Sequence, residues 1–311
     1  MADRCFSGVY RTQKATVTVR AAYIDFEMSP LETLSKILEI DVALIGSVAS
    51  EVGKHYKRFP LKTGRARPRW IDAPSGDLKK IQRALLDYLL YDMHPHPVAH
   101  GFFPGRSIVT NARPHVGKNW VLSFDVKDFF PSTTSELVRQ SLVHRGAGHD
   151  HALWGLVTDI CTLKGKLPQG APTSPHLANL CFYPCDEVLA GYAAERGLHY
   201  TRYADDMTFS GAENPDGLES VLKKTLAPFG YVIADKKTKH MGRDRRQSVT
   251  GLVVNNKVAL PRTLRRTMRA IQHDAMRLGL AGAVNRSRLV DSESEFWGYL
   301  AFKKMVEQKM E

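Results

Sequence analysis

The chain has 311 residues, of which 43% are hydrophobic, and a formal net charge of +12. This length is enough for a buried core and for one large domain or two to three subdomains. It has no run of eighteen apolar residues and no apolar segment in its first ten, so we expect no membrane helix and no signal peptide. Its four cysteines form no CxxC pair and no disulfide rhythm, which indicates free thiols in a reducing cytoplasm.

The positive charge is concentrated near the C-terminus. From Lys223 onward there are 19 Lys and Arg against 8 Asp and Glu, a net charge of +11. The preceding 222 residues carry 25 against 24, a net charge of +1. A basic C-terminal third on a nearly neutral body is typical of a nucleic-acid-binding element, and the alternative is a solubilising surface.

The predicted elements alternate helices with short strands. Ser29 followed by Pro30 indicates the N-cap of a first helix, and the basic stretch 59–74 fits a β-hairpin. The mixed order favours an α+β fold with an antiparallel sheet rather than a βαβ repeat. Helices are predicted at 30–38, 40–52, 77–90, 135–145, 151–163, 175–195, 218–229 and 262–278, and strands at 120–126, 198–203, 207–210, 231–234 and 249–254.

Three carboxylates stand where strands end or turn. Asp125 lies in the strand 120–126, on the face of Val121 and Ser123, and Asp205 and Asp206 lie side by side at a hairpin tip. Such carboxylates are costly to bury and repel each other unless positive charge compensates them. Two Mg²⁺ ions would do so, because Mg²⁺ prefers oxygen ligands and paired ions serve in-line phosphoryl transfer. The alternative for the adjacent pair is ordinary turn chemistry, which Asp favours.

Three motifs together resemble the reverse transcriptase family. YADD at 203–206 resembles its YxDD box, FDVKDFFPS at 124–132 its first metal-binding palm motif, and LPQGAPTSP at 167–175 its LPQGxxxSP motif. They occur in the family's order and spacing, and the resemblance covers about residues 30–300. It implies a right-hand polymerase with fingers, a palm with an antiparallel sheet flanked by helices, and a short helical thumb.

Two further signatures resemble the retron subclass. NARPH at 111–115 matches NAxxH upstream of the first palm motif, and VTG follows downstream at 249–251. At this chain length we also expect no appended maturase or endonuclease domain, as suits a retron enzyme. Each signature is short, and ordinary turn and strand chemistry is the alternative for either one alone.

The resemblance implies a catalytic set built on the three aspartates. Asp125, Asp205 and the backbone of Val126 would hold two Mg²⁺ ions, for which Mn²⁺ is a possible substitute, with Asp206 assisting. The primer hydroxyl would attack the α-phosphate of the incoming dNTP, and Lys237 resembles the lysine that protonates the leaving pyrophosphate. The alternative for Lys237 is a place in the basic surface.

The resemblance also implies a nucleotide pocket. Arg69, with Arg65 or Arg67, would grip the triphosphate, since guanidinium groups suit phosphate oxygens, and the alternative is a solvated hairpin face. Phe130 would be a steric gate against a 2′-OH, whereas Phe129 is expected in the core. Gln169 and Gly170 would line the pocket, where the glycine lets the backbone approach the base pair.

The division into subdomains follows the same resemblance. It predicts an N-terminal extension at 1–28, fingers at 29–118, a palm at 119–260 that includes part of the fingers at 140–175, and a thumb at 261–311. The thumb helix would track the template–primer backbone through phosphate contacts. The residues assigned to RNA or template–primer binding are Asn111, His115, Val249, Thr250, Gly251, Arg262, Arg265, Arg266 and Arg269; for His115 a structural role is the alternative.

A retron enzyme would have particular partners. It copies part of its own structured non-coding RNA from the 2′-hydroxyl of a guanosine, giving branched multicopy single-stranded DNA (msDNA). The resemblance implies anti-phage defence in the bacterial cytoplasm, commonly with an effector or toxin protein. The alternatives are a group II-like, diversity-generating or CRISPR-associated reverse transcriptase, an RNA-templated RNA polymerase, and a catalytically silent RNA-binding scaffold that controls a toxin. A zinc site at the histidines of 94–100 is disfavoured, because prolines break the spacing of these histidines.

Overall fold

An antiparallel sheet of four strands, in the order β4-β5-β3-β6, lies at the centre of the molecule. The computed structural model describes residues 28–61, 68–146, 151–287 and 289–308. In this sheet β3 pairs with both β5 and β6, and β5 pairs with β4. The strands are β3 (Trp120–Asp125), β4 (His199–Tyr203), β5 (Asp206–Gly211) and β6 (Lys239–Gly242).

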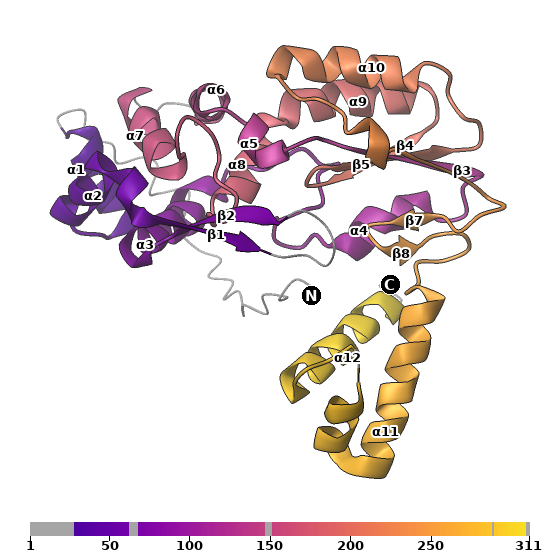
Figure 1. The fold of residues 1–311 in the computed structure, drawn as a ribbon. Helices are drawn as coiled ribbons and strands as arrows, with labels where there is room; N and C mark the ends of the chain where they lie inside the picture. Colours follow the sequence, from indigo (N-terminus) through magenta and orange to yellow (C-terminus); the bar gives the residue numbers. More distant parts are fainter. Residues whose placement is uncertain (1–27, 62–67, 147–150, 288, 309–311) are drawn as a thin grey trace.

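The two faces of this sheet are covered by different elements, because side chains alternate along each strand. Leu122 and Phe124 join the large core under α9 (Tyr183–Glu195) and α10 (Leu218–Leu226), which cover one face (Figure 1). Val121 points the other way, into a second core with α4 (Ile108–Ala112) and the hairpin β7 (Ser248–Val249) and β8 (Leu252–Val253). The predicted division of β3 into two faces is thereby confirmed.

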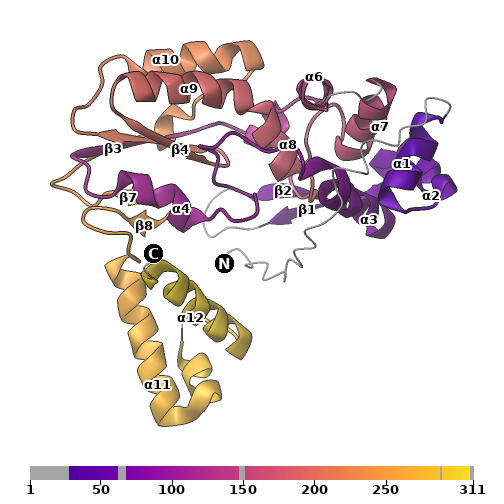
Figure 2. The same ribbon diagram turned by 180° about the vertical axis from the view of Figure 1, so that it is seen from behind.

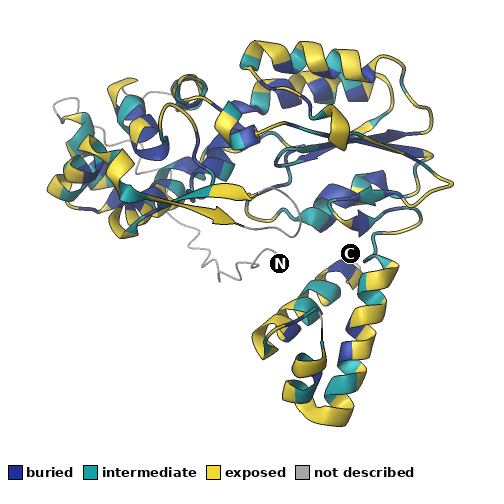
Figure 3. Ribbon diagram, viewed as in Figure 1, coloured by how far each residue is buried: buried dark blue, intermediate teal, exposed yellow. Residues whose placement is uncertain are grey.

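A helical region lies beside the sheet and shares the large core with it. Its first helix begins at a capping box, in which Ser29 and Glu32 bond to each other's backbone N–H groups, as the sequence predicts. The helices are α1 (Pro30–Leu38), α2 (Val42–Ser50), α3 (Gly76–Leu85), α6 (Ser135–Arg145), α7 (His151–Cys161) and α8 (Ser174–Cys181). From it projects the predicted hairpin, β1 (Tyr56–Leu61) and β2 (Arg69–Pro74), whose strands are largely exposed (Figure 3).

A pair of helices, α11 (Arg262–Arg286) and α12 (Glu293–Glu307), extends away from the sheet on the α4 side, as both views show (Figures 1 and 2). They have a small core of their own, while Met268 and Val306 join the second core and attach the pair to the sheet. The predicted fold class, an α+β right-hand polymerase with a short helical thumb, is confirmed. The residue limits of fingers, palm and thumb stay predictions.

Several predicted elements differ from the structure. The helix predicted at 175–195 is two helices that meet at Phe182, because Pro184 has no N–H to continue the first but fits the first turn of the second. The helix predicted at 77–90 becomes a π-helix at Leu86–Leu90, and that predicted at 218–229 ends in a 3₁₀ turn, Ala227–Phe229. The helix predicted to end at Leu278 continues to Arg286, with a break in its helical backbone at Gly279.

Two predicted strands are wrong. Residues 231–234 form one isolated bridge, between Ile233 and Val126, instead of a strand. Residues 249–254 are not a single strand, because Thr250 and Gly251 both have positive φ and turn the chain between β7 and β8. No helix of the described residues has the length and apolar character needed to cross a membrane.

Candidate active site

A tight turn between β4 and β5 brings the three predicted aspartates to one end of the sheet. Ala204 has φ of 55°, and the chain reverses there so that Asp206 begins β5 directly opposite Asp125 in the register. Asp205 precedes Asp206 in the turn, and its carbonyl accepts a 2.8 Å hydrogen bond from the N–H of Val126. Asp125 and Asp206, which are 81 positions apart, are therefore placed side by side by β-pairing alone.

The carboxylates at this end carry more negative charge than their surroundings compensate. Burial raises the pKa of Asp205, and the nearby charge of Asp125 raises it further, while Lys237 and Arg69 act in the opposite direction. Burial also raises the pKa of Asp206, although the Ser123 hydroxyl, which donates to it at 2.6 Å, lowers it. Such a cluster is stabilised by a cation.

Lys237 lies at this cluster, where the motif resemblance puts it. Its Nζ is 2.7 Å from Oδ1 and 2.8 Å from Oδ2 of Asp125. A 3₁₀ turn, Asp235–Lys237, carries it, and Ala234 N–H anchors that turn by donating to the carbonyl of Asp125 at 2.8 Å. The lysine side chain remains 55% exposed, so it can also reach a ligand in front of the site.

The donor chemistry of the site fits a divalent cation. Asp125, Asp205 and Asp206 offer carboxylate oxygens, which Mg²⁺ prefers, and their mutual repulsion is the charge imbalance that such an ion would relieve. Among the residues that the structure describes, no three His, Cys, Asp or Glu side chains form a ready-made metal site. Lys237 contacts both oxygens of Asp125.

Phe130 lies on the short helix α5 (Phe129–Ser132), which follows β3. Asp128 has φ of 48° and turns the chain sharply into this helix. Phe129 packs in the large core and is 4% exposed, as the sequence predicts, whereas Phe130 is only half-buried. The structure thus leaves part of the Phe130 ring available to a ligand.

The loop that contains Gln169 and Gly170 is attached to the β1–β2 hairpin. The carbonyl of Gln169 accepts from Asp72 N–H at 2.9 Å, and Gly170 has φ of 136°. A Cβ on Gly170 would lie 2.8 Å from the Asp72 carbonyl oxygen and 2.8 Å from Cγ2 of Ile71, so only glycine fits. The hairpin contact is thus a reason for this glycine that the sequence did not show.

Of the arginines predicted to bind the triphosphate, Arg69 belongs to the same hairpin. Arg69, in β2, is exposed, and its charge acts on Asp205, which puts it on the side of the carboxylates. Arg65 and Arg67 lie outside the described residues.

His115 and Asn111, which were predicted to contact RNA, are fully buried. Thr201 Oγ1 donates to the Asn111 carbonyl at 3.2 Å and therefore accepts from His115 Nε2 at 2.8 Å. Nδ1 of His115 then accepts from the Ser210 hydroxyl at 2.6 Å. Burial lowers the pKa of His115 to about 3, which keeps it neutral. An RNA contact through these two side chains is wrong for this conformation. The His115 ring and the backbone carbonyl of Asn111 join α4 and the following turn to the sheet, while the buried side-chain amide of Asn111 has no hydrogen-bond partner among the described residues.

The VTG signature packs against the same helix. Val249 is buried, and the Thr250 hydroxyl donates to the carbonyl of Ile108 at 3.2 Å. Thr250 has φ of 47° and Gly251 has φ of 82°, which are the left-handed conformations of a two-residue hairpin turn. A β-branched residue is strained there, and Gly251 is exposed. The two retron signatures are thus one structural unit at the base of α11, in which Gly251 at the tip of this turn and Arg113 are exposed.

The arginines predicted to bind template–primer lie on the first turns of α11. Arg262, Arg266 and Arg269 are exposed and Arg265 is half-buried, while Met268 faces the core. The exposed arginines therefore lie off the side of α11 that packs on the core.

The sequence reasoning missed a buried network behind the catalytic turn. Arg202 of β4 and Asp186 of α9 form a fully buried ion pair, and Arg202 also bonds to Asn179 of α8. The available signal was Asp186, which lies among largely apolar residues in the stretch 174–195, and one arginine beside the YADD motif.

The sheet, the acidic turn and the helical pair define a polymerase of the right-hand class. A family model described as "Reverse transcriptase (RNA-dependent DNA polymerase)" matches residues 57–254, and the chain belongs to this family. Within the family its relatives are retron reverse transcriptases, so the predicted resemblance is confirmed.

Two of these relatives illustrate the extent of the similarity. Retron Mx65 reverse transcriptase of Myxococcus xanthus is 38% identical over 243 residues, which cover 72% of this chain and 57% of that protein. Retron Ec86 reverse transcriptase of Escherichia coli is 36% identical over 251 residues, covering 79% of this chain and 78% of that protein. The chain therefore spans less than two thirds of the first relative. Among solved structures, a telomerase from Candida albicans aligns with 76% of this chain and 55% of its own, at 11% identity and a TM-score of 0.45.

Proposed function

We propose that this chain is the RNA-directed DNA polymerase of a retron, which copies its own non-coding RNA into msDNA from a 2′-hydroxyl primer. The observation that carries the proposal is the meeting of Asp125, Asp205 and Asp206 at one end of the sheet, in a chain whose relatives are retron reverse transcriptases. Anti-phage defence in a bacterial cytoplasm, with an effector or toxin partner, is the biological setting that we infer for it.

The proposed chemistry is the transfer of a nucleotidyl group to the primer. Two Mg²⁺ ions, held by Asp125, Asp205 and the backbone of Val126 with help from Asp206, would supply charge stabilisation to the attacking and leaving oxygens. The primer hydroxyl loses its proton and bonds to the α-phosphorus of the dNTP, and the bond to pyrophosphate breaks. Lys237, whose ammonium group lies at the carboxylates, would protonate that pyrophosphate.

The nucleotide would lie between the hairpin and the sheet. Arg69, with Arg65 or Arg67, would bind its triphosphate, and the half-exposed ring of Phe130 would exclude a 2′-hydroxyl. The backbone of Gln169 and Gly170 would border the same pocket, which the hydrogen bond from Asp72 ties to the hairpin.

The template–primer would lie on the α4 side of the sheet, where the thumb helices also extend. The basic surface at the start of α11 supports this placement, because arginine–phosphate contacts hold a duplex without reading its sequence. Among the residues of the two signatures that were assigned to RNA binding, Gly251 at the exposed tip of the VTG turn, with the half-buried Thr250 beside it, is the candidate for an RNA contact. The residues proposed for this surface are Thr250, Gly251, Arg262, Arg265, Arg266 and Arg269.

The nucleic acid bound to the purified protein tests the proposal. The chain would be expressed with its flanking genomic sequence, and the copurifying RNA and DNA would be sequenced before and after treatment with a 2′–5′ debranching enzyme. We expect one DNA species with a fixed 5′ end, joined to RNA and released by debranching. Absence of DNA, or DNA with free and variable 5′ ends, would contradict the retron assignment.

A further inference from the structure

A fully buried ion pair lies directly behind the catalytic turn. Arg202 Nε donates to Oδ1 of Asp186 at 2.9 Å, and Nη2 donates to Oδ2 at 2.5 Å. Tyr200 OH also donates to Oδ1, at 2.8 Å, and the guanidinium lies 4.5 Å from the centre of the Phe182 ring. Both charged side chains are 0% exposed. Replacing such a pair by apolar groups is often neutral or stabilising, so stability alone does not account for it.

The remaining nitrogen of Arg202 reaches the catalytic turn itself. Nη1 donates to Asn179 Oδ1 at 2.8 Å and to the carbonyl of Ala204 at 2.9 Å. Ala204 has positive φ, a conformation that is strained for a residue with a Cβ and persists only where the surroundings hold it. The side chain of Arg202 therefore bonds to the strained peptide that precedes Asp205.

Both peptide groups that flank Asp205 are held in this way. The carbonyl of Ala204, on one side, accepts from Arg202, and the carbonyl of Asp205, on the other, accepts from Val126 N–H. The two bonds come from different elements, since Val126 follows β3 and Arg202 belongs to β4 and pairs with Asp186 of α9. Together they fix the direction in which the Asp205 side chain leaves the backbone.

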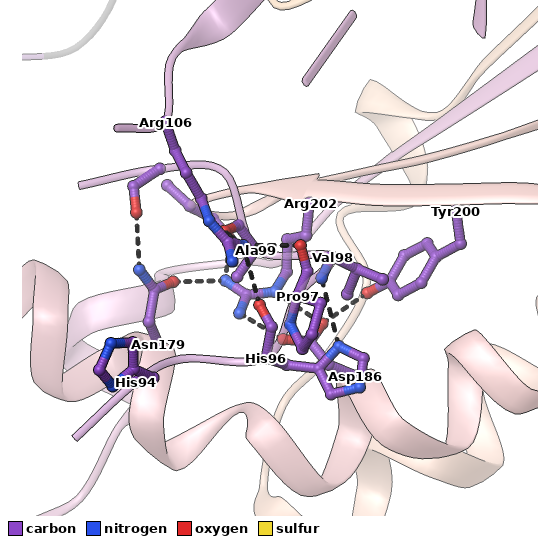
Figure 4. Close-up of polar contacts among 12 residues, drawn as sticks. His94, His96, Pro97, Val98, Ala99, Arg106, Asn179, Asp186, Tyr200 and Arg202 are labelled. Carbon is purple, nitrogen blue, oxygen red and sulfur yellow. Dashed lines mark hydrogen bonds and ion pairs between the residues drawn. The ribbon is translucent and has the colours of Figure 1, made fainter. Parts of the chain in front are cut away.

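A loop on the outer edge of β4 closes the network (Figure 4). Arg202 N–H donates to Val98, and the Arg202 carbonyl accepts from His100 N–H. Asn179 Nδ2 donates to the Gly101 carbonyl at 2.8 Å. A Cβ on Gly101 would lie 2.9 Å from Ala204 N, so the loop backbone touches the turn.

The loop is itself held in shape by an arginine. The Nη1 group of Arg106 donates to the carbonyls of His96, Pro97 and Ala99. Figure 4 shows the guanidinium groups of both arginines. The one of Arg202 is flanked by Asn179 and Asp186. The turn that carries Asp205 and Asp206 is thus enclosed by a satisfied polar network on the side away from substrate.

We propose that Arg202 is a positioning residue for catalysis: oriented by Asp186 and Asn179, it holds the Ala204–Asp205 peptide so that Asp205 meets Asp125. The expected effect of Arg202 on the reaction rate rests on the proposed polymerase function, whereas its expected effect on the conformation of the turn does not. Loss of a hydrogen bond from a charged donor corresponds to roughly a 10- to 100-fold effect.

The test uses a variant that keeps the core filled without the ion pair. Arg202→Met with Asp186→Leu is made in a Tyr200→Phe background, so that no buried hydroxyl loses its acceptor, and Tyr200→Phe alone is the matched control. Three quantities are measured on the full chain: hydrogen exchange of the amides at 203–206, single-turnover extension of a primed RNA, and affinity for that primed RNA.

We expect the turn amides of the triple variant to exchange roughly 10- to 100-fold faster than those of Tyr200→Phe. The maximal extension rate should fall by a similar factor, while the KM for dNTP and the affinity for primed RNA stay unchanged, since the defect lies in the transition state. Turn exchange and rate equal to those of Tyr200→Phe would overturn the proposal. If the wild-type chain extends no primer, the proposed function fails, and hydrogen exchange still decides the role of Arg202.

Gly101→Ala is the second variant, in case the triple variant does not fold. It leaves the ion pair intact but pushes a methyl group against Ala204 N, so it should also accelerate exchange at the turn and lower the rate. A folded Gly101→Ala protein with wild-type exchange and rate would overturn the proposal. Unfolding of both variants would assign the network to folding of the sheet, which would also overturn it.

Discussion

Two clusters that contain carboxylates belong to the β4–β5 hairpin: the Asp186–Arg202 pair and the Asp205–Asp206 turn. They differ in how their negative charge is compensated. Asp186 is fully buried, yet it has an arginine and a tyrosine hydroxyl as partners. Asp205 and Asp206 are only partly buried, yet burial and neighbouring carboxylates raise the pKa of both. The difference teaches that incomplete compensation of charge, more than depth of burial, distinguishes a site that binds a ligand from one that supports the fold.

Neutralising the two clusters should have opposite consequences, and this is the largest expected effect. Asp205→Asn with Asp206→Asn should lower primer extension by at least roughly 1,000-fold, because the metal-held charge stabilisation is worth several kcal/mol. A carboxylate whose folded-state pKa is raised destabilises the fold above that pKa, so this variant should melt at a higher temperature at pH 7.

Asp186→Asn is the matched change in the other cluster. It leaves Arg202 buried and uncompensated, so it should lower the unfolding free energy by about 3–5 kcal/mol. Extension assays and thermal melts on both variants check the comparison. A loss of stability in the Asp205/Asp206 variant equal to that of Asp186→Asn would mean that the turn carboxylates are structural.

Removal of the lysine beside Asp125 sharpens the comparison. Lys237 is the principal cation at the acidic turn, whereas Arg202 is the cation at Asp186. Lys237→Ala should lower the maximal rate by about 100-fold or more if the lysine is a general acid. Lys237→Arg, which keeps the charge but gives up its proton far less readily, should restore nucleotide binding more than rate.

The neighbouring exposed Lys236 supplies the control for this lysine. Lys236→Ala removes the same charge from the same 3₁₀ turn, and its rate should stay at the wild-type level. Equal effects of Lys236→Ala and Lys237→Ala in single-turnover assays would reduce Lys237 to a member of the basic surface.

Phe130 tests the substrate side of the turn. Phe130→Ala should raise incorporation of ribonucleotides relative to deoxyribonucleotides by roughly 10- to 100-fold, because the variant removes a steric contact worth 1–3 kcal/mol. Competitive incorporation of rNTP and dNTP measures the ratio, and Phe129→Leu, a change in the core, is the control. Unchanged sugar discrimination in Phe130→Ala would remove its role as a gate.

The buried His115 gives the smallest effect, on stability rather than on rate. Its pKa is lowered to about 3, so below its usual value of 6.5 the unfolded chain takes up a proton that the folded chain does not. The unfolding free energy should therefore fall by about 1.4 kcal/mol per pH unit as the pH drops from 6.5 towards 3.

His115→Gln should remove that part of the pH dependence in urea unfolding at pH 5 to 7.5. Burial also lowers the pKa of His100 and His176, each to about 4, so these histidines should leave a residual slope in the variant. An unchanged slope would show that His115 is solvated in the native protein.

The sequence predicted the parts of the site that short motifs and local geometry determine. The capping box at Ser29, the alternation of β3 and the hairpin tip at Asp205 need only neighbouring residues, and the structure has all three. It also predicted the helix 135–145 with its bounds.

The remainder depends on contacts that local patterns do not contain. β6 has four residues, Lys239–Gly242, and is a strand because it pairs with β3 across more than a hundred positions. Arg202 alternates with Thr201 and Tyr203, and nothing near it in sequence shows that it faces Asp186. His115 follows a five-residue helix, too short for a periodicity that would reveal burial.

The most direct test of the account is iron-dependent cleavage of the backbone by the bound ion itself. The full-length protein would be loaded with Fe²⁺ in place of Mg²⁺, exposed to ascorbate and peroxide, and its fragments would be mapped. We predict cuts in two segments, around 125–126 and around 204–206, that disappear together when Mg²⁺ is added or when Asp205→Asn is introduced. Cleavage in only one of these segments, or at positions elsewhere in the chain, would contradict the convergence of the three aspartates on a common metal centre.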